Sequence, residues 1–205
     1  HKVKKRNGRG DEPLNLDKMH KMVEEACTGL AGVSASQVEI QSGIQFYDGI
    51  TTQEIQEILI KSASDLIDLD HPNYQFVAAR LLLFSLRKSL YGKIREHPDL
   101  ETHIMKCTSM DVYDKDIFTK YSKEEIEKVN GYIDHERDFL FTYAGLRQVV
   151  DKYLVQDRSS GEVYETPQFM YMMIALTIFA EYSKETRLNY VRRYYDANSR
   201  NKHNI

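Results

Sequence analysis

The first nine residues carry five cationic side chains and no acidic one: Lys2, Lys4, Lys5, Arg6 and Arg9. A nucleoside triphosphate carries about four negative charges, so its pocket needs several cations that converge from different segments. If the helices bundle under an N-terminal hairpin, four cations from separate stretches could surround one polyphosphate: Lys5, Arg6, Lys18 and Lys88. Composition alone equally allows a solvated basic end that binds nothing.

Motifs for other chemistries are absent from the sequence. It contains no Gly-x-x-x-x-Gly-Lys-Ser/Thr phosphate loop, no Gly-x-Gly-x-x-Gly fingerprint and no His-Glu-x-x-His zinc motif. The run 135–138 (HERD) has the residue types of a kinase catalytic loop in the wrong order, and no Gly-rich loop precedes it. We interpret it as a helix start with acids near the N-terminus.

Histidine and cysteine spacing predicts no metal site. The seven histidines show no paired ligand spacing, and the two cysteines, Cys27 and Cys107, are too far apart for a zinc site or a disulfide framework. Both thiols are expected to be small buried groups in a reducing cytoplasm.

Composition and charge are those of an ordinary globular protein. Of 205 residues, 41% are hydrophobic and 29% charged, which allows one large or two small domains. The net charge of −3 gives the molecule no bulk attraction for nucleic acid or an anionic membrane. The longest apolar run, 169–179, is far shorter than the ~20 residues of a membrane-spanning helix and predicts a buried core helix.

Periodicity predicts a mainly α protein with one short hairpin. Asn7-Gly8 marks the hairpin turn. Helices follow at about 17–30, from a capping box at Ser36 to about Tyr47, from a second box at Thr51 to about Leu69, and over 74–90. The last of these is apolar nearly all round and must lie at the centre of a bundle.

A shift in composition near residues 92–98 predicts a domain boundary. Beyond it the pattern predicts helices at about 99–110, 115–120, 123–133, 136–154, 167–182 and 185–196. A turn at 157–161 separates two short extended pieces, and the polar tail 198–205 is expected to be disordered.

Short motifs follow one another over residues 3–197. They are 5–8 (KRNG), 15–19 (NLDKM), 37–39 (QVE), 44–50 (IQFYDGI), 74–81 (YQFVAARL), 86–88 (LRK), 91–92 (YG), 134–138 (DHERD), 152–156 (KYLVQ), 165–169 (ETPQF), 185–188 (ETRL) and 194–197 (YYDA). In this order they resemble the large (alpha) subunit of bacterial and phage class I ribonucleotide reductases, and the first two resemble the opening of the ATP-cone domain of that family.

The resemblance implies an ATP-cone over residues 1–92, a four-helix bundle capped by a small β-hairpin that binds ATP as activator or dATP as inhibitor, with Mg²⁺ on the nucleotide. A second helical domain would span 93–197, followed by the tail 198–205. The positions that match the family's nucleotide contacts are Val3, Lys5, Arg6, Glu12, Asn15, Lys18, Thr52 and Lys88. Among them the four cations suit phosphate, Glu12 and Asn15 the base and ribose, and Thr52 a hydroxyl contact.

Two residues depart from the family pattern. Relatives that respond to both nucleotides often have histidine at the positions of Gln56 and Ser85. Because neither position is histidine here, the resemblance does not decide whether dATP inhibits, whereas it still implies ATP binding.

The catalytic part of the family is not among these residues. The resemblance places the radical-bearing and redox cysteines in a ten-stranded barrel after residue 197, so we expect no catalytic residue and no cofactor for chemistry here. We expect one part of a split large subunit, completed by a partner chain with the barrel and served by a radical-generating small (beta) subunit. Alternatives are a truncated gene product, a stand-alone nucleotide-sensing module, and a helical interaction scaffold without ligand.

Overall fold

A computed structural model describes residues 2–4, 11–13, 16–43 and 49–200, with side chains from residue 16 onward. The chain forms two compact units. Unit 1 comprises His1–Leu86 and Phe141–Leu146, and unit 2 comprises Arg87–Leu140 and Arg147–Ile205. The division falls within helix α4 (Tyr74–Tyr91), so the last turn of this helix belongs to unit 2.

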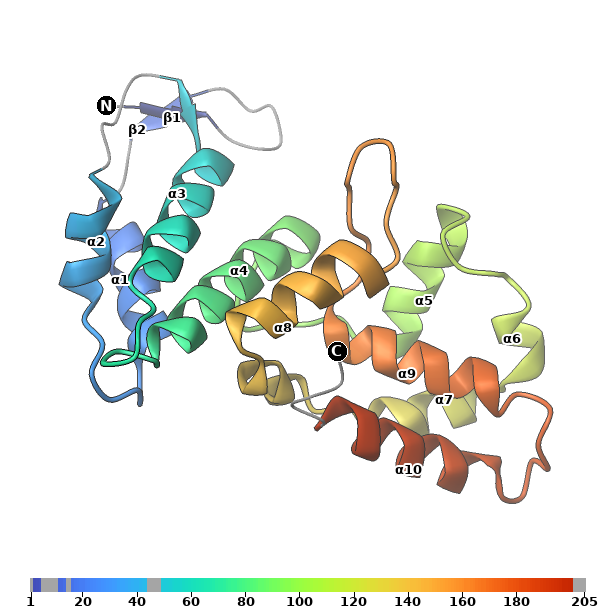
Figure 1. Ribbon diagram of the computed structural model, residues 1–205. Coiled ribbons are helices and arrows are strands. Elements are labelled where there is room, and N and C mark those ends of the chain that lie inside the picture. The colour runs from blue at the N-terminus through green and yellow to red at the C-terminus, as the bar shows by residue number, and fades with distance from the viewer. Residues whose placement is uncertain (1, 5–10, 14–15, 44–48, 201–205) are drawn as a thin grey trace. The chain divides into compact units, whose positions relative to one another are not determined.

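Unit 1 combines helices with a small sheet (Figure 1). Its helices besides α4 are α1 (Leu16–Cys27), α2 (Ala35–Ser42) and α3 (Thr52–Asp65). The strands β1 (Lys2–Lys4), β2 (Asp11–Pro13) and β3 (Ile50–Thr51) lie beyond one end of these helices. The fold is mainly α, as the sequence predicts.

The sheet has the strand order β2-β1-β3. Strands β1 and β2 are antiparallel, with Val3 opposite Glu12, which confirms the predicted hairpin. Strand β3 runs parallel to β1, with Lys4 opposite Thr51. A strand of two residues gives no periodic signal, which is why the sequence did not predict β3. The turn at Asn7-Gly8 lies outside the described residues.

Helix α4 supplies much of the core of unit 1. Seven of the eight residues from position 77 to position 84 are buried, with Arg80 the exception, and a stretch of that length faces every side of a helix. The prediction of a helix enclosed by its neighbours is confirmed. Val23 of α1 and Leu59 of α3 are also fully buried in unit 1.

Both predicted ends of helix α2 are wrong. Helix α2 is capped by Ser34, which has an extended backbone and accepts a hydrogen bond from the Gln37 amide; the predicted box at Ser36 does not form the cap. The helix ends at Ser42 because Gly43 adopts φ 49°, well before Tyr47, which lies outside the described residues.

Helix α3 begins where the sequence predicts but ends early. Thr51 caps it by accepting a hydrogen bond from the Glu54 amide at 3.0 Å. The helix stops at Asp65, and Leu69, predicted as its end, is 98% exposed. A local turn competes with the helix there, because the Asp68 carboxylate accepts hydrogen bonds from the amides of Asp70 and His71.

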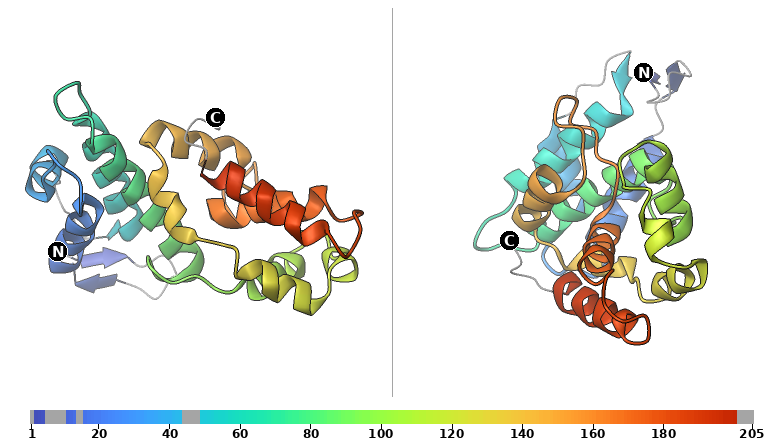
Figure 2. Two further views of the ribbon diagram at one scale, coloured as in Figure 1. Left: turned by 90° about the horizontal axis from the view of Figure 1, so that it is seen from below. Right: turned by 90° about the vertical axis from the view of Figure 1, so that its right-hand side faces the viewer.

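Unit 2 is built from short helices. They are α5 (Leu100–Ser109), α6 (Ile117–Lys120), α7 (Lys123–Asn130), α9 (Pro167–Ile178) and α10 (Arg187–Ser199). Helices α9 and α10 pack side by side (Figure 2). The apolar run 169–179 forms most of α9, and Phe169, Met172 and Leu176 are buried, which confirms a core helix.

The predicted single helix at 136–154 is wrong. The chain instead forms a 3₁₀ helix (His135–Leu140), helix α8 (Tyr143–Gln148) and a π-helical turn (Val149–Tyr153). Thr142 breaks the run because its side-chain oxygen accepts a hydrogen bond from the Gly145 amide at 3.1 Å, which starts a new helix.

The polar tail was also placed wrongly in part. Helix α10 continues through Asn198 to Ser199, whereas disorder was expected from Asn198 onward. Ser199 is buried, and its hydroxyl accepts a hydrogen bond from Arg137 at 2.7 Å. This contact holds the last helical turn, and residues 201–205 lie outside the described part of the chain.

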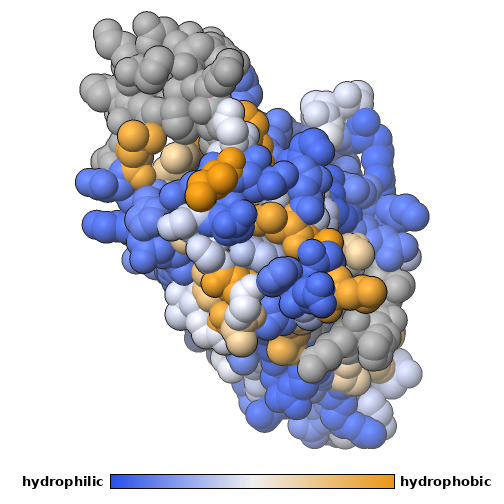
Figure 3. Space-filling view, turned by 60° about the vertical axis from the view of Figure 1, so that its left-hand side comes forward, coloured by the Kyte–Doolittle hydropathy of each residue, from blue (hydrophilic) through white to orange (hydrophobic). Residues whose placement is uncertain are grey.

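Among the described residues, no helix is long and apolar enough to cross a membrane. On the face drawn in Figure 3, hydrophobic side chains form small patches separated by hydrophilic ones. Scattered apolar residues of this kind are normal on protein surfaces.

Candidate nucleotide-binding site

The described residues include only part of the predicted nucleotide contacts. Lys5, Arg6 and Asn15 lie outside the described residues, and only the backbone is described for Val3 and Glu12. The other three have described side chains and come from three helices: Lys18 from the first turn of α1, Thr52 from the start of α3 and Lys88 from the end of α4. The convergence of all eight around one ligand therefore stays a prediction.

The sheet brings two relevant chain segments together in unit 1. Strands β1 and β3 are parallel, and their last residues, Lys4 and Thr51, lie opposite each other. Both strands therefore finish at the same end of the sheet. Helix α3 starts directly after Thr51. A helix N-terminus carries free amides and a positive partial charge, which favour phosphate. The strand that precedes Lys5 and Arg6 in the sequence thus lies beside such a terminus.

The two positions that depart from the family pattern are in direct contact. Gln56 of α3 is 2% exposed, and its side-chain oxygen accepts a hydrogen bond from the Ser85 hydroxyl of α4 at 2.9 Å. The pair therefore joins two helices of unit 1. The sequence did not predict this contact, since the residues are 29 positions apart.

A second cross-helix contact also went unpredicted. Arg80 of α4 donates hydrogen bonds to the carbonyl oxygens of Ala26 at 3.3 Å and Thr28 at 2.8 Å. These carbonyls are at the C-terminal end of α1, where backbone acceptors have no partner within the helix. Arg80 thus stabilises the end of the helix that carries Lys18.

Unit 2 contains a buried polar network around one ion pair. Arg87 lies 3.0 Å from the Asp138 carboxylate, with side-chain exposures of 1% and 0%. Gln168 donates to the other Asp138 oxygen at 2.9 Å, and Tyr195 donates to Gln168 at 2.6 Å. Burial raises the pKa of Asp138, whereas Arg87 and Gln168 oppose that rise. The run 135–138 also begins a 3₁₀ helix with Glu136 and Asp138 in its first turn, as the sequence predicts, so it has a structural role both as a helix start and through this buried pair.

Three histidines of unit 2 gather around Phe169. His97 and His135 stack with ring centroids 3.6 Å apart and planes 6° apart, and His103 stacks on Phe169 at 4.1 Å. Among the described residues, His97 Nε2 and His135 Nδ1 are buried and have no hydrogen-bond partner. Sequence spacing missed this group because its members are brought together only by the fold.

His97, His135 and Asp138 place three potential ligand atoms within 4.8 Å of one another. The surroundings do not suit a cation, however. Arg87 already neutralises Asp138 in the buried interior, so a divalent ion would leave its charge uncompensated. Parallel stacked rings also direct their nitrogen lone pairs side by side rather than toward a common point. We assign no metal to this cluster.

The histidine group makes the stability of unit 2 sensitive to acid. Burial lowers the pKa of His97 and of His103 to about 4, and that of His135 to about 2. Below the unfolded value near 6.5, the unfolded chain binds more protons than the folded one, so stability falls as the pH drops from about 7 toward 4. For His103 alone the loss by pH 4 is roughly 3 kcal/mol.

Urea unfolding at a series of pH values, followed by a tyrosine signal, measures this effect. His135→Phe should flatten the decline, whereas His71→Phe, at an exposed position of unit 1 whose ion pair with Asp68 is also exposed, should change it far less. Equal unfolding free energies at pH 7 and pH 4.5 in the wild type would contradict the prediction.

Both cysteines are unreactive in this arrangement. Cys27 and Cys107 are free thiols; Cys107 is buried as expected, whereas Cys27 is only partly buried, which corrects that expectation. Desolvation raises the pKa of each to about 11. A thiol with such a pKa is protonated at neutral pH and is a poor nucleophile.

Two family models match separate parts of the chain. Residues 1–89 match the ATP cone domain, and residues 139–204 match the ribonucleotide reductase all-alpha domain. The second match extends to residue 204, beyond the last resembling motif at 194–197 and into the tail 198–205. The chain thus joins an ATP cone to an all-alpha reductase domain.

Curated relatives cover nearly the whole chain. It is 49% identical over 197 residues to the ribonucleoside-diphosphate reductase subunit alpha of Haemophilus influenzae, over 96% of this chain and 26% of the relative. Subunit alpha of reductase 1 of Escherichia coli is 49% identical over 195 residues, 95% of this chain and 25% of the relative. The subunit alpha of Enterobacteria phage T4 is 40% identical over 179 residues, 86% of this chain and 24% of the relative.

The chain belongs to the class I ribonucleotide reductase alpha-subunit family and corresponds to the N-terminal ATP cone and all-alpha region. It spans about a quarter of the length of the curated relatives it matches.

Proposed function

We propose that residues 1–92 form a regulatory domain that binds ATP or dATP and thereby controls ribonucleotide reduction. The observation that carries this proposal is the ATP cone match over residues 1–89. The β1–β3 register supports it, because it sets the end of the basic strand beside the N-terminus of α3. Residues 93–197 form the helical domain that links the cone to the catalytic part, and the tail 198–205 follows it.

In this proposal the phosphates are held by Lys5, Arg6, Lys18 and Lys88, with Mg²⁺ bound to the nucleotide. Glu12 and Asn15 contact the base and ribose, Thr52 adds a hydroxyl contact, and Val3 contributes from β1. Several cations are required because each charge-assisted hydrogen bond to phosphate contributes only about 1.5–3 kcal/mol.

We propose further that the catalytic barrel acts from a partner chain and that a radical-generating beta subunit completes the enzyme. The reduction of ribonucleoside diphosphates needs reactive cysteines, and the two thiols present here have a pKa raised to about 11. The second unit would provide the docking surface for the barrel.

Nucleotide binding is tested by calorimetric titration of the protein with ATP and with dATP in the presence of Mg²⁺. We expect saturable binding of ATP. The titration with dATP is the informative comparison, because Gln56 and Ser85 contact each other at positions where relatives that respond to both nucleotides often have histidine. No heat with either nucleotide would favour the helical scaffold over the regulatory domain.

Assembly is tested by native mass measurement of the complex purified under ATP and under dATP. A nucleotide can shift assembly only by its different affinity for the assembly states, so the mass distribution should change between the two samples. Nucleotide binding by a protein that joins no barrel-containing chain would favour the stand-alone sensing module.

A further inference from the structure

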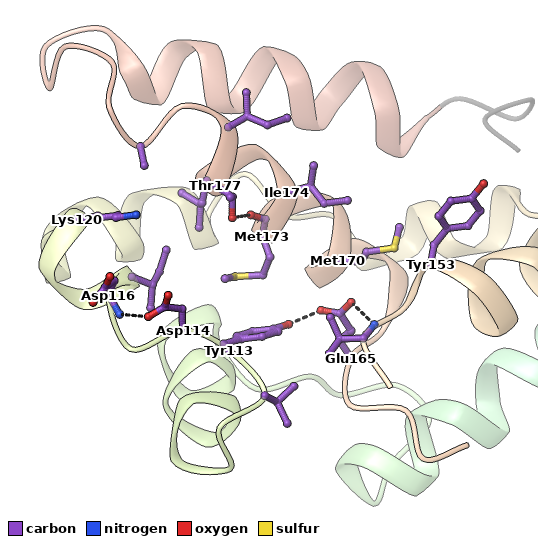
Figure 4. Close-up of a pocket in the computed structure, with 16 residues that line it drawn as sticks. Tyr113, Asp114, Asp116, Lys120, Tyr153, Glu165, Met170, Met173, Ile174 and Thr177 are labelled. Atoms are coloured by element: carbon purple, nitrogen blue, oxygen red, sulfur yellow. Dashed lines mark hydrogen bonds between the residues drawn. The ribbon is translucent and has the colours of Figure 1, made fainter. Parts of the chain in front are cut away.

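Unit 2 contains a cavity of about 450 Å³ that the nucleotide site does not involve (Figure 4). It is bordered by α6, α9, the loop that follows α5 and the segment that precedes α9. Met170, Met173 and Ile174 of α9 line one side with apolar side chains. This volume is within the usual range for small-molecule sites, and thioether side chains adapt readily to the shape of a ligand.

The polar end of the cavity is formed by Glu165, which is 1% exposed. One of its carboxylate oxygens accepts a hydrogen bond from the Tyr113 hydroxyl, and the other accepts one from the Val155 amide at 2.9 Å (Figure 4). Both of these donors, the hydroxyl of Tyr113 and the amide of Val155, are neutral groups. Burial raises the pKa of Glu165, as expected for a buried carboxyl that has no cationic side chain among its hydrogen-bond partners in the described residues.

The charges that line the cavity have an acidic excess. Asp114 and Asp116 lie at its far end and Glu165 at its inner end, whereas Lys120 is the cation among the lining residues. A carboxylate has about four lone-pair sites, and two remain on Glu165 after its two hydrogen bonds. The cavity thus offers a buried acceptor whose charge a cationic ligand would compensate.

We propose that this cavity binds a small protonated amine with an apolar body, such as an arylalkylamine. Its ammonium group donates to the Glu165 carboxylate, and its apolar part packs against Met170, Met173 and Ile174. The ammonium group supplies a positive charge next to the Glu165 carboxylate, which the neutral donors Tyr113 and Val155 do not supply. The site is independent of the cone, so it stands or falls separately from nucleotide binding.

The test compares phenethylamine with 2-phenylethanol, which has a similar shape without the charge. Binding is followed by NMR of the protein with ¹³C-methyl-labelled methionine, in which Met170 and Met173 report on the cavity. We expect phenethylamine to shift both methyl signals and to bind about tenfold more tightly than the alcohol, since a charge-assisted hydrogen bond is about twice as strong as a neutral one.

Glu165→Gln should remove this preference, because the amide still accepts hydrogen bonds but has no charge. Glu162→Gln, an exposed change close in sequence, is the matched control and should keep the preference. If the wild type binds both probes equally, the site is merely apolar and the proposal is wrong. The absence of shifts with either probe at millimolar concentration, or a preference that persists in Glu165→Gln, overturns it as well.

Discussion

Replacement of Lys88 with alanine is expected to weaken ATP binding by about ten- to hundredfold, the equivalent of one lost charge-assisted contact with phosphate. Lys88 is exposed in the last turn of α4, where its removal should cost little folding stability. Calorimetric titration with ATP measures the change. Lys5→Ala should have a similar effect, because both cations are assigned to the same triphosphate.

Lys61→Ala is the matched control for these two variants. Lys61 is an exposed cation on α3 of unit 1, which also contains Lys5, and it pairs with Asp65 at 3.4 Å. Its replacement should leave the affinity for ATP unchanged, which excludes a general effect of net charge. Unaltered ATP binding by both Lys5→Ala and Lys88→Ala would remove the phosphate assignment.

The second large effect is expected at the buried ion pair of unit 2. Asp138→Leu should lower the free energy of unfolding by about 3–5 kcal/mol, because it leaves the Arg87 guanidinium buried and unpaired. The double variant Arg87→Met, Asp138→Leu should regain much of this loss, since apolar side chains can replace a buried pair. Urea unfolding of the two single variants and the double variant measures the coupling between the residues.

An exposed pair in the same unit provides the comparison. Lys93 and Glu96 are 2.9 Å apart but 64% and 70% exposed, so Glu96→Ala should change the unfolding free energy by less than about 1 kcal/mol. If Asp138→Leu were no more destabilising than Glu96→Ala, the buried pair would not support unit 2 as described.

Local sequence signals predicted those parts of the fold that local interactions decide. The apolar residues around α4 indicate a buried helix, and Thr51 followed by Glu54 indicates the start of α3; the structure has both. The pair Asn7-Gly8 predicted a hairpin whose strands do pair. In each case residues within one or two turns determine the structure.

Features that depend on distant residues were missed. The run 135–154 has helical composition, but the Arg87 guanidinium donates to the His135 carbonyl and Thr142 caps a new helix, so the run is divided. Strand β3 exists only because β1 lies beside it. Tertiary contacts of this kind override local propensity and leave no periodic trace.

The candidate nucleotide site was predicted mainly by resemblance rather than by pattern. Lys18 and Lys88 are single lysines on separate helices, and no spacing relates them. The Tyr113 contact with Glu165 and the stack of His97 on His135 likewise join residues far apart in sequence. Side chains that meet only in the folded chain cannot be recognised without a structure or a known relative.

The most direct test of the account is hydrogen exchange, measured by mass spectrometry, with and without ATP. We predict that ATP slows exchange in three separate stretches, namely the N-terminal segment 2–18, the β3–α3 junction at 49–54 and the end of α4 at 85–91. Unchanged exchange in these stretches at saturating ATP, or protection confined to other parts of the chain, would contradict a triphosphate pocket built from them.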